Sequence, residues 1–242
     1  MYGKSGRIGL LVPSVNTVVE PEFNRLLSAD IGVYAARLRN SRADCEDSRA
    51  MLQHVERAAD ELGSAQADVI AFACTASSFV AGDAGEAQLR QRIEQAGRTR
   101  ALTTSGAVAA ALHVLQVRRL VGATPYPDEL NALEKHYLEA AGFEVLEISG
   151  MGIVEAFEIG TLTPQQTAAF ARDAWRPGAE ALFISCTNLR SIEVLQKLAA
   201  EFGKPVFSSN SATCWACLRT LDGAEEQAMA ALQGVPAGRA VY

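Results

Sequence analysis

Two apolar runs of the sequence match each other at a fixed offset and constrain the fold more than any other feature. The run ADVIAFACT contains Cys74 and the run AEALFISCT contains Cys186, each followed by a threonine and 112 residues apart (186 − 74). Pro13 and Pro125, which end two further apolar runs, have the same separation of 112 residues (125 − 13). The shared offset indicates an internal duplication. We therefore expect two similar lobes that face each other across a cleft.

The rest of the chain alternates between two periodicities. Short apolar segments, typical of buried parallel strands, are separated by longer segments with helical spacing. The expected strands are 7–13, 68–74, 100–105, 118–125, 143–149, 180–186 and 204–209, and the expected helices are 48–64, 86–97, 106–117, 127–142, 163–175 and 191–203. This pattern predicts an α/β fold with two pseudo-symmetric lobes, each a mainly parallel sheet flanked by helices. Residues 1–100 plus 206–242 are predicted to form the N-terminal lobe, and residues 101–205 the C-terminal lobe.

Composition narrows the class of protein and of partner. With 49% hydrophobic residues, 21% charged residues and a net charge of −6, the chain is typical of a globular protein. It lacks the basic excess that nucleic acids and anionic membranes attract. The N-terminal run IGLLV is stopped by Pro13, and no run reaches the roughly eighteen apolar residues of a membrane span. We expect a cytoplasmic homo-oligomer with five reduced cysteines and with no nucleic-acid or membrane partner.

Cys74 and Cys186 are the strongest candidates for catalysis. Free cysteine is often a small buried hydrophobic residue, and that is the alternative interpretation of each thiol alone. In open parallel sheets, however, ligands bind beyond the carboxyl ends of the strands, where both cysteines lie. A following helix start favours the thiolate. The two thiols could act as nucleophile and acid, or as base and acid on opposite faces of a substrate.

Polar residues at the same strand ends are candidate substrate contacts. Side-chain and backbone donors at helix starts suit a carboxylate or an enediolate, although the same residues could simply cap helices. The candidates are Ser14, Asn16, Thr75, Ala76, Tyr126, Thr187 and Asn188. We find no motif for a metal, a nucleotide or pyridoxal phosphate, so no cofactor and no metal site are predicted. Cys214 and Cys217, inside a helical pattern, are expected to be core residues.

Four motifs, LLVPSVNT, AFACTASS, ATPYPDELN and ISCTNLRS, together resemble the aspartate/glutamate racemase superfamily. They are most similar to its branch of maleate cis-trans isomerases and arylmalonate decarboxylases. The resemblance runs from Arg7 to about Leu221 and implies two pseudo-symmetric lobes, no cofactor, and cysteine chemistry in the cleft. By this resemblance Cys74 is the nucleophile, Cys186 moves the proton, and Asn16 and Tyr126 hold carboxylates.

The resemblance favours a cofactor-independent isomerase of a small dicarboxylate, most like maleate isomerase. Alternatives remain open. They are a two-cysteine racemase of amino or carboxylic acids, an arylmalonate-type decarboxylase, and a non-catalytic ligand-binding protein. The stretch GMGIVEAF lacks an asparagine that the isomerases carry, and the residues after Cys74 are rich in hydroxyl groups, as in the decarboxylases. The decarboxylases, in contrast, lack the first cysteine.

Overall fold

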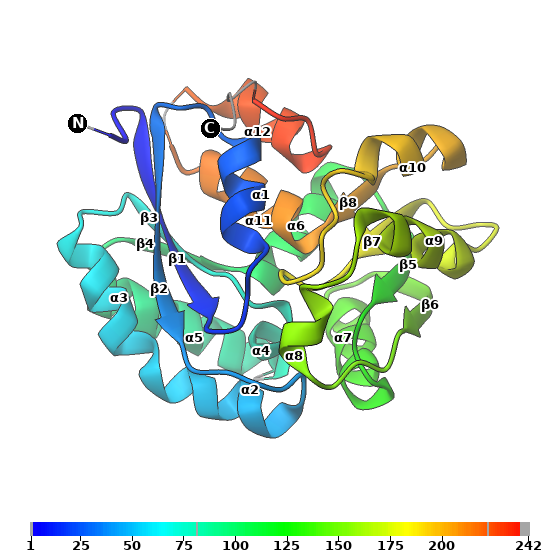
Figure 1. The fold of residues 1–242 in the computed structure, drawn as a ribbon, viewed down its shortest axis with the longest axis horizontal. Coiled ribbons are helices and arrows are strands. Elements are labelled where there is room, and N and C mark those ends of the chain that lie inside the picture. Colours follow the sequence, from blue (N-terminus) through cyan, green and yellow to red (C-terminus); the bar gives the residue numbers. More distant parts are fainter. Residues whose placement is uncertain (1, 81, 222, 238–242) are drawn as a thin grey trace.

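Two four-stranded parallel sheets form the centres of two lobes that lie side by side (Figure 1). The computed structural model describes residues 2–80, 82–221 and 223–237. The first sheet has the order β2-β1-β3-β4 and the second the order β6-β5-β7-β8. The strands are β1 (Gly6–Pro13), β2 (Ile31–Leu38), β3 (Val69–Phe72), β4 (Arg100–Thr103), β5 (Arg119–Thr124), β6 (Glu144–Gly150), β7 (Ala181–Ile184) and β8 (Val206–Ser208). Because the two strand orders are equivalent, the predicted two-lobed α/β fold with pseudo-symmetric lobes is confirmed.

Helices cover the sheets and connect successive parallel strands. They are α1 (Val19–Leu26), α2 (Cys45–Met51), the 3₁₀ turn η1 (Leu52–His54), α3 (Val55–Ser64), α4 (Thr75–Val80), α5 (Gly82–Gly97), α6 (Thr104–Val114), α7 (Asp128–Ala140), α8 (Ala156–Ile159), α9 (Pro164–Ala174), α10 (Leu195–Phe202), α11 (Ser209–Leu218) and α12 (Glu225–Leu232). Capping boxes begin α9 at Thr163 and α11 at Ser208, and the left-handed Gly203 ends α10.

Strand β2 is the main element that the sequence pattern missed. Within the described residues it is an edge strand that pairs with β1 alone, and its residues alternate irregularly between buried and exposed. Its sequence, IGVYAARL, is nevertheless apolar except for Arg37, so the signal of a strand was available and was not used. The predicted helix 48–64 is also interrupted, since the η1 turn separates α2 from α3.

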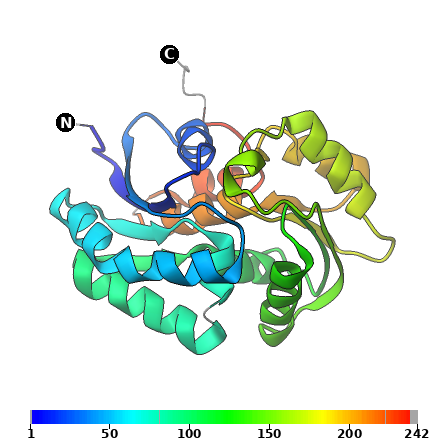
Figure 2. The same ribbon diagram turned by 60° about the horizontal axis from the view of Figure 1, so that its bottom comes forward.

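The hydrophobic core continues from one lobe into the other. Strands β3 and β7 are buried along their whole length, as near-continuous apolar runs predict. Helix α11 lies between the lobes, and its Trp215 and Leu218 belong to a cluster that includes residues of both sheets (Figure 1). A second cluster lies under the first sheet, where α3 and α5 run side by side (Figure 2). The shared core holds the two lobes, and hence the cleft, in a fixed relation.

The predicted boundaries between the lobes remain a proposal, and the pairing of two strands bears on them. Strand β4 pairs with β3 in the first sheet, although the predicted boundary at 100/101 assigns most of it to the second lobe. Strand β8 pairs with β7 in the second sheet, although residues from 206 onward were assigned to the first lobe. Strand β4 is thus the last strand of the first sheet, and β8 is the last strand of the second sheet. Residues 1, 81, 222 and 238–242 of the predicted division lie outside the described residues.

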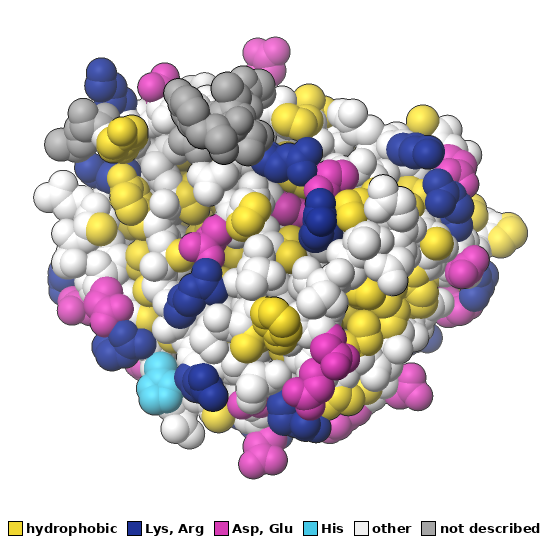
Figure 3. All heavy atoms as spheres, viewed as in Figure 1, with side chains coloured by type: hydrophobic (Ala, Val, Ile, Leu, Met, Phe, Trp, Pro, Cys, Tyr) yellow, Lys and Arg dark blue, Asp and Glu magenta, His cyan; other side chains and the backbone are white. Residues whose placement is uncertain are grey.

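The distribution of surface charge and the lengths of the helices are relevant to nucleic-acid and membrane partners. On the face seen in Figure 3, acidic and basic side chains are interspersed rather than gathered by sign. Among the described residues, every helix is too short or too polar to cross a lipid bilayer.

Candidate active site

Cys74 and Cys186 line one narrow pocket between the lobes. Cys74 follows the end of β3 in the first lobe, and Cys186 follows the end of β7 in the second. Parallel strands end at a common edge, so each lobe delivers one thiol to the cleft. Within the described part of the chain, the pocket is lined by Pro13, Val15, Asn16, Asn40, Arg42, Ala43, Ser48, Cys74, Thr75, Ala76, Ser77, Tyr126, Ala156, Ile159, Cys186, Thr187 and Asn188.

The Cys74 thiol lies beside the first turn of α4. Its S–H donates to Ser77 Oγ at 3.3 Å. Burial raises the pKa of Cys74, whereas hydrogen bonds from the Ser77 hydroxyl and from the backbone N–H groups of Ser77 and Ala76 lower it. The thiolate, once formed, therefore has donors ready to stabilise it. A thiolate of high pKa is also the stronger nucleophile.

Cys186 has an unusual backbone conformation and an unusually weak acid group. Its φ of 91° lies in the left-handed region, which costs a residue other than glycine about 1–3 kcal/mol and is typical of functional sites. The pKa of Cys186 is raised to about 12, mainly by burial and to a smaller extent by negative charge on Cys74 and Glu134. The Tyr126 hydroxyl and the Asn188 N–H, 3.4 Å from the sulfur, act in the opposite direction. Cys186 is thus a thiol at neutral pH and suited to give a proton.

Tyr126 is held in place by a small polar network at the end of β5. Its N–H donates to Thr124 Oγ1 at 3.1 Å, and its carbonyl accepts from Asn131 Nδ2 at 3.2 Å. Thr124 and Asn131 are hydrogen-bonded to each other as well. Burial, followed by the charge of Cys186, raises the pKa of Tyr126 well above its usual value. Its neutral hydroxyl is therefore available as a donor in the pocket.

Asn16 and Thr187 connect the lobes beside the pocket. Asn16 Oδ1 accepts from the N–H groups of Val18 and Val19, so that it caps the start of α1, and its Nδ2 donates to Thr187 Oγ1 at 3.0 Å. Thr187 Oγ1 in turn donates to the carbonyl of Ala73 at 3.0 Å. Both side chains have protein partners, and a substrate contact through either remains a prediction.

Asn188 and Thr75 are engaged in the same way. Asn188 Oδ1 accepts from the Thr17 N–H at 3.0 Å, and Asn188 Nδ2 donates to the Ala156 carbonyl at 2.8 Å. Thr75 Oγ1 donates to Ser209 Oγ at 2.8 Å. These two residues and Ala76 line the pocket, where a substrate could reach their backbone groups.

Ser14 is the one predicted site residue outside the pocket lining of the described residues. Its hydroxyl donates to the Asn40 carbonyl at 3.0 Å and accepts from the Asn40 N–H at 3.1 Å. It joins the end of β1 to the segment after β2, and Asn40 itself lines the pocket.

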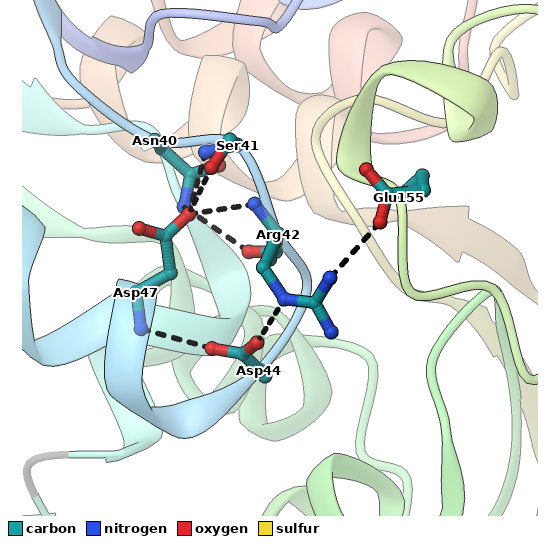
Figure 4. A network of polar contacts seen from close by, with 6 residues as sticks. All are labelled: Asn40, Ser41, Arg42, Asp44, Asp47 and Glu155. Carbon is teal, nitrogen blue, oxygen red and sulfur yellow. Dashed lines mark hydrogen bonds and ion pairs between the residues drawn. The ribbon is translucent and has the colours of Figure 1, made fainter.

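Arg42 is a pocket residue that the sequence pattern did not single out. Its guanidinium binds Asp44 at 2.7 Å and, across the cleft, Glu155 at 3.0 Å, while its N–H donates to Asp47 at 2.6 Å (Figure 4). Backbone bonds join the same segments, from the Ala43 N–H to the carbonyl of residue 154 at 2.7 Å. The two lobes are thus in contact at this edge of the pocket. The segment follows β2, the strand that was missed.

Ser209 is a second residue that was missed. Its Oγ accepts hydrogen bonds both from Thr75 Oγ1 at 2.8 Å and from the Cys186 N–H at 3.0 Å. It therefore connects the two loops that carry the thiols. The polar stretch SSNS (208–211), which begins inside the expected strand 204–209 and continues beyond it, was the available signal. Among the residues that the structure describes, no three or more His, Cys, Asp and Glu side chains lie together so as to hold a metal ion.

Comparisons with known proteins agree with this geometry. A family model described as arylmalonate decarboxylase matches residues 8–233. The maleate isomerase of Nocardia farcinica is 32% identical over 226 residues, which are 89% of this chain and 90% of that protein. The maleate isomerase of Pseudomonas putida is 29% identical over 229 residues, covering 89% and 92% of the two chains.

Solved structures give the same result. One is a cysteine-to-serine variant of the Nocardia farcinica maleate cis-trans isomerase with a covalently bound succinylcysteine intermediate. It has a TM-score of 0.86 and 27% identity, and the match covers 92% of this chain and 98% of that chain. A crystal structure of arylmalonate decarboxylase has a TM-score of 0.77 and 25% identity, with coverage of 90% and 93%.

Proposed function

The chain belongs to the arylmalonate decarboxylase family, and on this premise we propose that it is a cofactor-independent cis-trans isomerase of maleate or a closely similar cis-enedioate. One observation carries the proposal. Cys74 and Cys186 come from different lobes and line the same pocket, the first with donors for a thiolate and the second as a weak acid. The succinylcysteine seen in the Nocardia farcinica maleate isomerase is the adduct that such a pair of thiols would form.

Addition is the first step. The Cys74 thiolate, supported by the N–H groups of Ala76 and Ser77, forms a C–S bond with one olefinic carbon. The electron pair of the double bond moves to the neighbouring carbon and into its carboxylate. The Cys186 thiol then gives its proton to that carbon and becomes a thiolate. The adduct is a succinyl thioether with a single C–C bond.

Rotation and elimination complete the reaction. The single bond rotates by about half a turn, the Cys186 thiolate takes back a proton from the carbon, and the C–S bond breaks to give the trans-enedioate. The Cys74 thiolate and the Cys186 thiol are restored. One negative charge passes from Cys74 sulfur to the enediolate, then to Cys186 sulfur, and back by the same route, so that no electron or proton is gained or lost over the cycle.

The carboxylates of the substrate need donors in the pocket. We propose that the Tyr126 hydroxyl, Arg42 and the backbone N–H groups after each cysteine bind them, with Asn16 close by. Fixed donors of this kind stabilise the enediolate that forms during addition. Cytoplasmic residence and homo-oligomeric assembly also remain proposals, which fractionation of cells and gel filtration with light scattering would test.

The test is turnover of maleate together with the fate of each thiol. Conversion to fumarate, followed by proton NMR, should be lost in Cys74→Ser, which has no nucleophilic thiol. Cys186→Ser should be slowed by about 10²–10⁴-fold, the usual cost of losing acid–base help, and should retain a mass increase of one substrate on the Cys74 peptide. Cys45→Ala, outside the pocket lining, is the control and should retain activity.

Other substrates distinguish the alternatives. Solvent deuterium entering one enantiomer of a 2-substituted acid, with unmodified Cys74, would favour the racemase. Release of carbon dioxide from an arylmalonate would favour the decarboxylase. If the protein bound these acids and turned over none of them, a non-catalytic ligand-binding protein would be favoured.

A further inference from the structure

Glu134 is a buried carboxyl group beside the active site to which the mechanism above assigns no task. It lies on α7, is 2% exposed, and accepts a hydrogen bond at Oε1 from Ser185 Oγ at 2.6 Å. Its Oε2 has no hydrogen-bond partner among the described residues. A buried carboxylate with an unpaired oxygen is costly, and a proton on that oxygen removes the charge. The surroundings of Glu134 therefore suit a neutral carboxylic acid.

Glu134 also lines a small cavity directly behind the pocket. The cavity is lined, within the described residues, by Thr75, Phe79, Ser105, Val108, Glu134, Tyr137, Leu138 and Phe183. Thr75 belongs to the lining of the pocket as well, so the cavity and the pocket share a wall. A volume of about 10 Å³ is at the lower limit of what one water molecule needs. The hydroxyl-bearing side chains of Thr75, Ser105 and Tyr137 make its lining partly polar.

The charge of Glu134 acts on two pocket residues. Negative charge at Glu134 raises the pKa of both Tyr126 and Cys186. Burial raises the pKa of Glu134 itself to about 8, and the hydrogen bond from Ser185 lowers it. The titratable groups that face Glu134 are Tyr126 and Cys186 from the pocket and Tyr137 from α7. Two of these three are groups that the mechanism uses.

We propose that Glu134 is a positioning residue that works as a neutral acid: it orients Ser185 and the adjoining Cys186, and its ionisation switches the enzyme off at alkaline pH. The inference rests on the proposed function, in which Cys186 becomes a thiolate next to a substrate with two negative charges. A further negative charge, buried close enough to act on Cys186, would oppose that step. The neutral acid retains the hydrogen bond to Ser185 without adding charge.

The test compares Glu134→Gln with the wild-type protein between pH 7 and 10. Glutamine retains an acceptor for Ser185 and cannot ionise. The Cys74 thiolate, whose pKa is raised, becomes more abundant with pH in both proteins and increases kcat/KM for maleate. In the wild type the ionisation of Glu134 should oppose this increase above pH 8, whereas in Glu134→Gln the increase should continue. A single ionisation near pH 8 leaves about one-tenth of the acid form at pH 9, so the ratio of variant to wild type should rise about ten-fold between pH 7 and 9. Glu139→Gln, exposed on the same helix, should follow the wild type.

A second measurement needs no substrate. Alkylation of Cys186 by iodoacetamide, followed by peptide mass spectrometry, reports its thiolate. At pH 9 the reaction at Cys186 should be several-fold faster in Glu134→Gln than in the wild type, because a negative charge has been removed. Equal alkylation rates at every pH would overturn the inference. Failure of the wild type to isomerise maleate would overturn the proposed function and leave the alkylation result standing.

Ser185→Ala provides an independent variant if Glu134→Gln does not fold. Loss of the Ser185 hydrogen bond raises the pKa of Glu134, since that bond lowers it. The opposing effect of Glu134 ionisation on kcat/KM should then begin at higher pH than in the wild type. If the pH at which this effect begins were the same in Ser185→Ala as in the wild type, the proposed role would be contradicted. It would also be contradicted if Glu134→Gln folded and were as inactive at pH 7 as Cys186→Ser.

Discussion

The hydroxyl of Thr187 donates a hydrogen bond to the carbonyl of Ala73 across the two lobes, at 3.0 Å. Ala73 directly precedes Cys74, and Thr187 directly follows Cys186. One hydrogen bond thus joins the two chain segments that carry the thiols. Asn16 Nδ2 donates to the same hydroxyl, so that Thr187 Oγ1 has a partner on each side. The spacing of the thiols depends on this contact between lobes.

Thr187→Val should damage both stability and turnover. The variant retains the shape of the side chain and leaves Asn16 Nδ2 and the Ala73 carbonyl buried without this partner. We expect a loss of about 1–3 kcal/mol in the free energy of unfolding, measured by urea titration. A small shift between the thiols should lower kcat by about ten- to a hundred-fold. Thr161→Val, at an exposed position, is the control, and an unaltered kcat in Thr187→Val would argue against this role.

Tyr126→Phe should make Cys186 a still weaker acid. The Tyr126 hydroxyl lowers the pKa of Cys186, which burial has raised to about 12, so its removal raises that pKa further. We expect slower alkylation of Cys186 at pH 9 and a fall in kcat. Tyr34→Phe, on the edge strand β2, should leave both unchanged. Alkylation at the wild-type rate in Tyr126→Phe would show that the hydroxyl does not support the thiolate.

Glu22 should make the protein less stable as the pH rises from about 4.5 to 7. Glu22 Oε1 accepts from the N–H groups of Ser191 and Ile192, and its Oε2 accepts from Asn210 Nδ2. Burial nevertheless raises its pKa from 4.5 to about 7. Between these values the folded protein binds more protons than the unfolded chain, so the free energy of unfolding falls with rising pH, by up to about 1.4 kcal/mol per unit.

The quantity to measure is the slope of the unfolding free energy against pH, rather than its value at any single pH. Glu22→Gln removes the titrating group, so the slope of the unfolding free energy between pH 5 and 7 should become shallower, whatever the variant costs at a single pH. Glu158→Gln, on the exposed face of α8, should retain the wild-type slope. The same slope in Glu22→Gln and the wild type would mean that another group titrates. Glu134 contributes in the same direction, up to about pH 8.

Arg42→Gln should weaken substrate binding with little effect on stability. The ion pairs of Arg42 with Asp44 and Glu155 are largely exposed, and such pairs contribute about 0–1 kcal/mol. A cation in the pocket lining, however, can bind a carboxylate, and loss of a charge-assisted hydrogen bond corresponds to about ten-fold or more in KM. Steady-state kinetics and thermal melting separate the two effects. Arg57→Gln, which changes an exposed arginine of α3, is the control. An unaltered KM in Arg42→Gln would show that Arg42 does not bind the substrate.

The sequence by itself determined the two-lobed α/β architecture and the position of both thiols. These features depend on local patterns: apolar runs that form buried strands, a cysteine at the end of each, and a repeat at equal spacing. Tyr126 was found in the same way, because it follows a strand end that is equivalent to that of β1.

Only the tertiary structure decided which polar side chains contact the thiol-bearing segments and which carboxyl groups are buried between the lobes. Ser209, Glu22 and Glu134 lie far along the chain from the cysteines, and their roles arise because α1, α7 and α11 pack where the lobes meet. Burial there raises the pKa of both carboxyl groups, and burial is a property of packing rather than of residue type. The hydrogen bonds of Thr187 and Asn188 to the opposite lobe have the same origin, since no sequence pattern records the distance between two separately formed strand ends.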